Sequence, residues 1–354
     1  MAEETAQLRN AFSLSPADWA DWCAGYNIPK FRAKQIWHEI YSRLAPSWDD
    51  MPVVPKWLRE KLAAEFDIDP LKQEDVLGTP DGVRKFLFAT VDGQHVETVL
   101  IPARDGRRTV CVSSQVGCAF GCAFCASGQG GCIRSLESGE IVAQVMAAER
   151  LLAPSGERVS NIVVMGMGEP MANYDNVLAA LLTLNNPDGL GIGARRITIS
   201  TCGVVPGIKR LAAEGLQFEL SVSLHAPDDE LRSKIMPVNK RWPLDELMQA
   251  CRDYTETTGR IITFEYTLVG GQSATPERAH QLVNLLRGRK CRVNLIPLSP
   301  VKEFDGRAPS PRECETFQQI LEDAHINVTM RHSRGGKVSA ACGQLRKRAE
   351  ARRQ

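Results

Sequence analysis

The sequence lacks the features that direct a protein into a membrane or stabilise it with disulfides. Residues 1–8 have neither the basic start nor the apolar run of a signal peptide, and no apolar stretch approaches the ~20 residues that cross a bilayer. Eleven cysteines in 354 residues are too few for a disulfide scaffold. The net charge of +1 singles out no acidic or basic partner. We therefore expect a cytoplasmic protein with reduced thiols and no membrane partner.

Histidine is also scarce, and none lies close in sequence to the main cysteine motif, Cys118-Ala-Phe-Gly-Cys122-Ala-Phe-Cys125. The small residues in this C-x3-C-x2-C spacing let three thiolates converge on one metal centre. A structural zinc site normally has four protein ligands, whereas a four-iron cluster held by three cysteines leaves one iron open to a small molecule. The motif favours a [4Fe–4S] cluster. Zinc completed by Cys111 or Cys132, or free thiols, are the alternatives.

The first 90 or so residues form a small helical region. Ser15-Pro16 is typical of a helix start, and proline-rich breaks precede a helix near 56–66. The apolar residues at helical spacing are Trp19, Trp22, Phe31, Ile36, Trp37, Ile40 and Tyr41. We assign the tryptophans and the tyrosine among them to a core rather than to platforms for nucleobases. From Gly82 the period shifts to short strands joined by a turn at Asp92-Gly93.

Beyond these strands, strand-like runs alternate with helical patterns. The runs cover 109–113, 161–165, 196–200, 218–224, 261–268, 292–296 and 326–330. Helix starts are clear at Thr275-Pro276 and at the capping box Ser310-Pro311-Arg312-Glu313. The alternation predicts an α/β fold with a parallel sheet, either doubly wound or closed toward a barrel. Its active site is expected at the C-terminal ends of the strands.

Small and polar residues follow several of these strands. The segment 165–170 reads Met-Gly-Met-Gly-Glu-Pro, in which Gly168 permits a close backbone approach and Glu169 can accept hydrogen bonds from a ligand's ammonium group. Later strands end near Ser200, Ser223 and His225. A plain turn and a core histidine are the alternative explanations, but the position at one sheet edge favours a ligand site.

Two further cysteines are expected near the same edge. Cys111 lies on the first strand of the parallel sheet, and Cys342 follows the glycine-rich segment 334–336 beyond the last strand. Two cysteines that are distant in sequence but close to one site indicate a redox pair, or a nucleophile with its resolving partner. Composition alone favours buried, inert thiols.

Together these motifs resemble the radical S-adenosylmethionine (SAM) superfamily and, within it, the dual-specificity RNA adenine-C2 methyltransferases. The likeness runs from about residue 10 to Leu345 and rests on Cys111-Val-Ser-Ser-Gln-Val-Gly-Cys118, Met165-Gly-Met-Gly-Glu-Pro170, Ser223-Leu-His-Ala-Pro227, Asn294-Leu-Ile-Pro297 and Ala341-Cys-Gly-Gln-Leu345. The resemblance implies a radical SAM partial (βα)6 barrel over 104–337. It also implies a helical RNA-binding accessory domain over 1–90 with a strand linker to about 103, and a C-terminal segment, 338–354, with a catalytic cysteine and a basic tail.

The resemblance implies methylation of adenine C2 in 23S rRNA and in tRNA beside the anticodon. The cofactors would be S-adenosylmethionine and one [4Fe–4S] cluster on Cys118, Cys122 and Cys125. A flavodoxin-like electron donor and a monomeric enzyme are expected. The positions that match the family's cofactor contacts are Gly168, Glu169, Ser200, Ser223, Leu224, His225 and Ser299. Relatives often carry asparagine where this chain has Ser299.

The same resemblance implies a methyl-cysteine mechanism, because an aromatic carbon is not nucleophilic enough to take a methyl group directly. Cys342 would receive a methyl group from one S-adenosylmethionine, and a radical generated from a second would activate it for addition to adenine. Glu97 would accept a proton, and Cys111 would form a transient disulfide with Cys342 as the product leaves.

Two other functions share part of this pattern. An adenine-C8 methyltransferase of the antibiotic-resistance branch shares every motif, and a zinc-stabilised RNA-binding protein without catalysis would leave Cys342 without a role. Basic residues that can neutralise RNA phosphates, or can simply be solvated loops and helix ends, cluster at 104–108, 195–196, 240–241, 287–292 and 346–353.

Overall fold

One ten-stranded sheet organises the protein, and its strand order is β14-β13-β12-β11-β10-β9-β6-β5-β4-β3. The computed structural model describes residues 8–79, 81–299, 304–331 and 344. From β14 to β6 neighbouring strands are parallel, and β5, β4 and β3 continue the sheet antiparallel. The parallel strands are β6 (Arg108–Cys111), β9 (Asn161–Val164), β10 (Ile197–Thr201), β11 (Glu219–Ser223), β12 (Ile262–Leu268), β13 (Cys291–Pro297) and β14 (Asn327–Met330).

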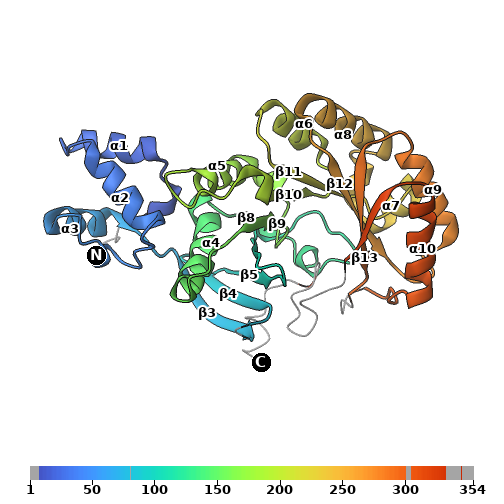
Figure 1. Cartoon of the computed structure of the whole chain (residues 1–354), viewed down its shortest axis with the longest axis horizontal. Coiled ribbons are helices and arrows are strands. Elements are labelled where there is room, and N and C mark those ends of the chain that lie inside the picture. The colour runs from blue at the N-terminus through green and yellow to red at the C-terminus, as the bar shows by residue number, and fades with distance from the viewer. Residues whose placement is uncertain (1–7, 80, 300–303, 332–343, 345–354) are drawn as a thin grey trace, which may run out of the picture.

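Helices connect the parallel strands and cover the outside of the curved sheet (Figure 1). They are α4 (Ser138–Leu152), α5 (Tyr174–Asn185), α6 (Val205–Ala213), α7 (Asp229–Ile235), α8 (Leu244–Thr258), α9 (Pro276–Leu286) and α10 (Pro311–Asp323). Thr275 and Ser310 cap α9 and α10 as predicted, each accepting a hydrogen bond from a first-turn amide. Because β3 and β14 stay at the two edges of the described sheet, the barrel is partial, which confirms the predicted α/β architecture.

The N-terminal helices form a separate lobe beyond α4 and α5, on the left of Figure 1. They are α1 (Pro16–Gly25), α2 (Phe31–Tyr41) and α3 (Lys56–Glu65), and the strands β1 (Arg9–Asn10) and β2 (Phe66–Asp67) pair in parallel beside them. The residues assigned to the core, Trp19, Trp22, Trp37 and Tyr41, are all buried. Phe31, the first residue of α2, is 53% exposed although it keeps the helical spacing.

Two hydrogen bonds tie this lobe to α4. The amide of Gly139 donates to Ser13 Oγ over 3.1 Å, and Arg150 Nη2 donates to the carbonyl of Ala45 over 2.8 Å. Gly139 is a position where a larger side chain does not fit, since an added Cβ would lie 2.4 Å from the Asn10 side chain. The first turn of α4 therefore fits closely against the lobe.

The strands begin earlier than the sequence pattern indicates. β4 (Arg84–Thr90) and β5 (His95–Pro102) form the predicted hairpin around Asp92-Gly93, but β3 (Leu71–Gly78) precedes them and was not predicted. β3 is an edge strand whose side chains are mostly exposed, so it shows no apolar alternation. No helix in the described part of the chain is both long and apolar enough to span a bilayer.

Candidate active site

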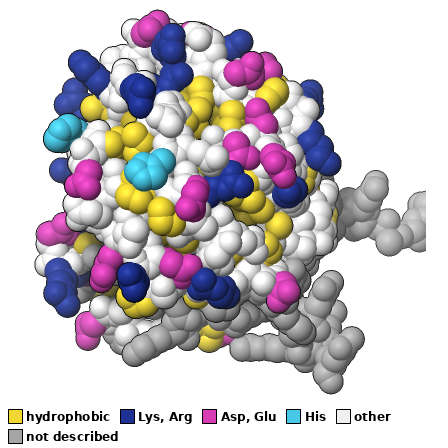
Figure 2. All heavy atoms as spheres, turned by 90° about the vertical axis from the view of Figure 1, so that its right-hand side faces the viewer, with side chains coloured by type: hydrophobic (Ala, Val, Ile, Leu, Met, Phe, Trp, Pro, Cys, Tyr) yellow, Lys and Arg dark blue, Asp and Glu magenta, His cyan; other side chains and the backbone are white. Residues whose placement is uncertain are grey.

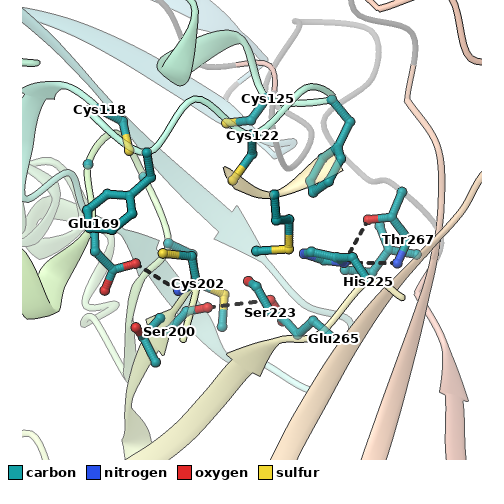
Figure 3. Close-up of a pocket in the computed structure, with 18 of the residues that line it drawn as sticks. Cys118, Cys122, Cys125, Glu169, Ser200, Cys202, Ser223, His225, Glu265 and Thr267 are labelled. Atoms are coloured by element: carbon teal, nitrogen blue, oxygen red, sulfur yellow. Dashed lines mark hydrogen bonds between the residues drawn. The ribbon is translucent and has the colours of Figure 1, made fainter. Parts of the chain in front are cut away.

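A pocket lies at the C-terminal ends of the parallel strands, beneath the loop that carries the cysteine motif (Figure 3). Its lining includes most of the positions singled out from the sequence, which are Cys118, Cys122, Cys125, Gly168, Glu169, Ser200, Ser223, His225 and Ser299. The three cysteines form one side, and the strand-end serines lie opposite them (Figure 3). The fold thus brings together residues separated by up to 180 positions in the sequence.

Backbone hydrogen bonds hold the cysteine loop in place, and the side chain of Gln129 adds two longer ones to the carbonyls of Ala123 and Cys125. The amide of Cys118 donates to the carbonyl of Gly131 over 3.0 Å, across the hairpin of β7 (Gln115–Gly117) and β8 (Cys132–Ser135). The amide of Ala123 donates to the carbonyl of Ile235 at the end of α7 over 2.9 Å. The loop is therefore anchored on both sides of the pocket.

The thiols share a buried, anionic environment that suits a cationic metal centre. Burial, with smaller contributions from the neighbouring Glu169 and Cys125, raises the pKa of Cys118 to about 12. Burial and Cys125 also raise the pKa of Cys122. An iron cluster bound to these thiolates supplies the positive charge that the site itself lacks, and thiolates are the usual ligands of such clusters. The residues present fit a [4Fe–4S] cluster.

A single metal ion fits less well. Zinc–thiolate bonds are about 2.3 Å long, so zinc ligands must crowd around one point. Within the described residues, no three cysteine, histidine or carboxylate side chains are close enough together to hold one ion. In a four-iron cluster each cysteine binds a different iron, so wider spacing is required. The geometry therefore favours the cluster over the zinc alternative.

The glycine-rich segment after β9 packs directly on the strand that leads to the cysteine loop. Gly168 has φ +101°, and an added Cβ would lie 2.6 Å from the Cβ of Gln115. The Oε1 atom of Gln115 accepts a hydrogen bond from the amide of Glu169 over 2.9 Å. Glycine is required here by backbone conformation and by this close approach, a reason that the sequence alone did not provide.

Glu169 is 3% exposed, and two backbone amides fix its carboxylate. Its Oε1 accepts from Met171 over 3.0 Å and its Oε2 from Cys202 over 2.7 Å, the latter at the end of β10 (Figure 3). Burial raises the pKa of this carboxyl group, and the two amides oppose that shift. The remaining lone pairs can accept hydrogen bonds from an ammonium group, which would restore a compensating charge.

His225 has a fixed orientation and protonation state. Its Nδ1 accepts a hydrogen bond from the amide of Thr267 over 3.0 Å, so the ring proton lies on Nε2 (Figure 3). Burial, with a smaller effect from Arg232, lowers the pKa of the imidazole to about 3. The ring of Phe124 packs edge-on against it, with centroids 4.8 Å apart. His225 is therefore a neutral hydrogen-bond donor that links the cysteine loop to the strand ends.

Several pocket residues were missed from the sequence. Glu265 is 6% exposed in the middle of β12 and lies 3.5 Å from Ser200 Oγ (Figure 3). The sequence feature that could have identified Glu265 is a carboxylate inside an otherwise apolar strand. Arg232 of α7 is fully buried and donates to the carbonyls of Cys202, Ser223 and Leu224 over 2.7 to 3.2 Å. An arginine on an apparently exposed short helix gave no such signal.

Other predicted residues lie outside the pocket lining. Leu224 is fully buried, and its amide donates to the carbonyl of Glu265. Cys111 is 8% exposed and packs with Val99 and Met167 on one face of the sheet. Glu97 lies on this face and forms an ion pair with Lys85 over 2.7 Å, with both side chains 2% exposed. Cys342 lies outside the described residues.

Nothing in the local sequence distinguishes Glu97 from a solvated strand glutamate, but the structure places it in the protein interior. In the antiparallel pairing, Leu87 faces Glu97 and Lys85 faces Val99, so Lys85 and Glu97 are diagonal neighbours on the same face. Cys111 faces Val99 from the other side. The registers of β4, β5 and β6 thus place an ammonium, a carboxylate and a thiol on one continuous face.

Comparison with known proteins identifies the class of this site. The chain matches the radical SAM superfamily over residues 112–286. A crystal structure of a radical SAM methyltransferase from Sphaerobacter thermophilus superposes with a TM-score of 0.94 at 48% sequence identity, covering 96% of this chain and 99% of that one. The fold and the pocket define a radical SAM enzyme, which works with a [4Fe–4S] cluster and S-adenosylmethionine.

The N-terminal lobe narrows this class to one family. Residues 9–68 match the ribosomal RNA large subunit methyltransferase N-terminal domain. Proteins described as probable dual-specificity RNA methyltransferase RlmN, from Bacillus thuringiensis (strain Al Hakam) and Bacillus anthracis (strain A0248), are each 47% identical over 335 residues, 95% of this chain and 92% of theirs. The chain belongs to the RlmN family of radical SAM methyltransferases, as its motifs predict.

Proposed function

We propose that this protein methylates C2 of adenine in 23S rRNA and in tRNA. The observation that carries the proposal is the match over almost the whole chain to RlmN relatives, which are described as dual-specificity RNA methyltransferases. The pocket described above supplies the residue types that this chemistry needs. We place the reaction in the cytoplasm, with a monomeric enzyme and a flavodoxin-like electron donor.

In this proposal Cys118, Cys122 and Cys125 hold the cluster through their thiolates. When bound, the cluster and S-adenosylmethionine supply a 5′-deoxyadenosyl radical. The carboxylate of Glu169 binds the ammonium group of S-adenosylmethionine, and His225 donates from Nε2 as a neutral group. The remaining cofactor contacts are proposed at Gly168, Ser200, Ser223, Leu224 and Ser299.

The methyl group reaches the RNA through the chain's own cysteine. Cys342 carries the methyl group, and after its carbon radical has added to adenine C2, Glu97 accepts the proton from C2 and the surplus electron would return to the bound cluster, which restores the aromatic ring. The thiolate of Cys111 then attacks the sulfur of Cys342, so that the S–S bond forms as the S–C bond breaks, and the released carbon takes up a proton to become the methyl group. The placement of Cys111 and Glu97 on the same sheet face supports these roles. Residues 1–90 would bind RNA, residues 104–337 would catalyse, and 338–354 would present Cys342.

The experiment is anaerobic incubation of the iron-reconstituted protein with S-adenosylmethionine, a reductant and either 23S rRNA or tRNA, followed by mass spectrometry of the nucleosides. We expect 2-methyladenosine from both RNAs with the wild type and none with Cys342→Ala. 8-Methyladenosine would instead assign the protein to C8 chemistry. An intact cluster without any methylated adenosine would refute the proposal.

A further inference from the structure

Basic side chains from segments far apart in the sequence converge at the N-terminal ends of the parallel strands, opposite the pocket. Arg195 and Arg196 directly precede β10, Lys290 precedes β13 and Arg292 lies at its start. Since β13, β12, β11 and β10 are neighbours and parallel, these positions share one edge of the sheet. We call the six exposed residues at this end of the barrel the basic edge: Arg195, Arg196, Arg252, Arg287, Lys290 and Arg292.

These charges lie close enough together to repel one another. Burial lowers the pKa of the half-buried Arg260, which precedes β12, and Arg195 and Arg292 lower it further. Burial and then Arg252 have the same effect on the pKa of Arg289. Each half-buried arginine therefore lies within the field of exposed arginines from other segments. Repulsion of this kind favours binding of an anion.

The charges of the basic edge are not neutralised by ion pairs with carboxylates in the described part of the chain. Within the described part of the chain, none of its six residues forms an ion pair, whereas exposed basic residues such as Arg210, Lys234 and Arg307 each pair with a carboxylate. Of the acidic residues near this end, Glu219 pairs with Arg260, and Glu256 lines a hollow beside Arg252.

The loop that joins α9 to β13 lines two hollows in this surface. Arg287, Arg289 and Lys290 line two adjoining hollows, one on the α8 side and one on the side of the segment before β14. Figure 2 shows several Lys and Arg side chains in the upper part of this face, with a few acidic side chains among them, and basic and acidic side chains interspersed further down. A chain whose net charge is +1 thus concentrates positive charge locally.

We propose that the basic edge binds the phosphate backbone of the RNA substrate at a point remote from the modified adenine. The inference rests on the proposed function, which supplies a large polyanion as partner. An acidic electron-donor protein has the same charge but must approach the cluster. Strands of five to seven residues separate the basic edge from the pocket, roughly 20 Å at about 3.3 Å per residue. RNA, in contrast, is long enough to contact both ends of the barrel.

The test compares the wild type with the triple variant Arg252→Gln, Lys290→Gln, Arg292→Gln, in binding to labelled 23S rRNA and tRNA over a range of salt concentrations. Each lost phosphate contact lowers the steepness of the plot of log affinity against log salt by about 0.7–0.9. We expect the slope to fall by about 2 and the affinity to fall roughly tenfold or more at low salt. Methylation at saturating RNA with a chemical reductant should stay unchanged, because the pocket is untouched.

A matched control removes the same charge from paired positions: Arg210→Gln, Lys234→Gln, Arg307→Gln. We expect this variant to keep nearly the wild-type slope, and an equal loss in both variants would overturn the proposal by assigning the effect to net charge. Unchanged RNA binding, with methylation impaired only when a protein supplies the electrons, would overturn it in favour of the electron donor.

The same experiment separates this inference from the proposed function. A wild type that methylates adenosine, together with an unchanged salt dependence in the Arg252, Lys290 and Arg292 variant, refutes the basic edge alone. A wild type that binds RNA but yields no methylated adenosine refutes the proposed function, and the salt dependence still decides whether the basic edge contacts RNA.

Discussion

The buried ion pair between Lys85 and Glu97 gives a prediction whose size follows from the structure. At 2.7 Å the two unit charges attract by about 6 kcal/mol at an effective dielectric constant near 20. Desolvation of both groups offsets much of this attraction, but removing one member of a buried ion pair typically costs about 3–5 kcal/mol, because the remaining charge loses that attraction and stays buried. We expect Lys85→Met to lower the free energy of unfolding by that amount, a large share of the ~5–15 kcal/mol that stabilises a domain.

The assay is equilibrium urea unfolding of the iron-reconstituted protein, followed by tryptophan fluorescence. Lys85→Met and Glu97→Gln are measured singly and together, so that the double-mutant cycle isolates their coupling. The double variant should lose less stability than the sum of the single variants, because it removes both charges of this ion pair together. The penalty of Lys85→Met should also shrink at low pH, where Glu97 can become neutral by taking up a proton. Additive losses and a penalty that does not change with pH would refute the reasoning.

Three further predictions concern the pocket. Gly168→Ala should destabilise the protein and weaken S-adenosylmethionine binding, measured by calorimetry, because φ is +101° and the new Cβ would lie 2.6 Å from Gln115. Arg232→Met should weaken that binding and cost about 3 kcal/mol in urea unfolding, because the hydrogen bonds that Arg232 donates to three backbone carbonyls are lost. His225 has a pKa of about 3 in the folded protein, so the unfolded state binds a proton more readily. The free energy of unfolding should therefore fall as the pH drops below ~6.5. In His225→Asn, the free energy of unfolding should depend less on pH.

The sequence predicts the parallel part of the fold well because most of its strands carry buried apolar residues and alternate with helices. Every strand-like run from 109–113 to 326–330 overlaps an observed strand, and the helix starts with caps are confirmed at Ser15, Thr275 and Ser310. β3 was missed because an exposed edge strand needs no apolar alternation. Local patterns therefore suffice where burial dictates the residue type.

The pocket is predictable to the extent that its residues occupy strand ends. Ser200, Ser223 and His225 follow this rule, since parallel strands deliver their C-terminal ends to one edge. Arg232 and the partner of Glu97, Lys85, do not, because their roles depend on contacts with segments distant in the sequence. A buried charge shows its function only once its partners are known.

The segment from Cys111 to Cys118 explains how these parts are coupled. Ser113 Oγ donates to the carbonyl of Glu97 over 2.6 Å and accepts from the amide of Met167 over 2.9 Å, so one hydroxyl joins β5 to the glycine-rich segment. Two residues later, the side chain of Gln115 holds the amide of Glu169. These hydrogen bonds fix the segment between Cys111 and Cys118 relative to both β5 and the glycine-rich segment. A shift of this segment by one residue would break all three of them. The need for these hydrogen bonds accounts for a polar stretch, Ser-Ser-Gln, that is almost fully buried. Apolar residues would pack there, but they could not hold the cluster loop, the cofactor loop and the Glu97 strand in register.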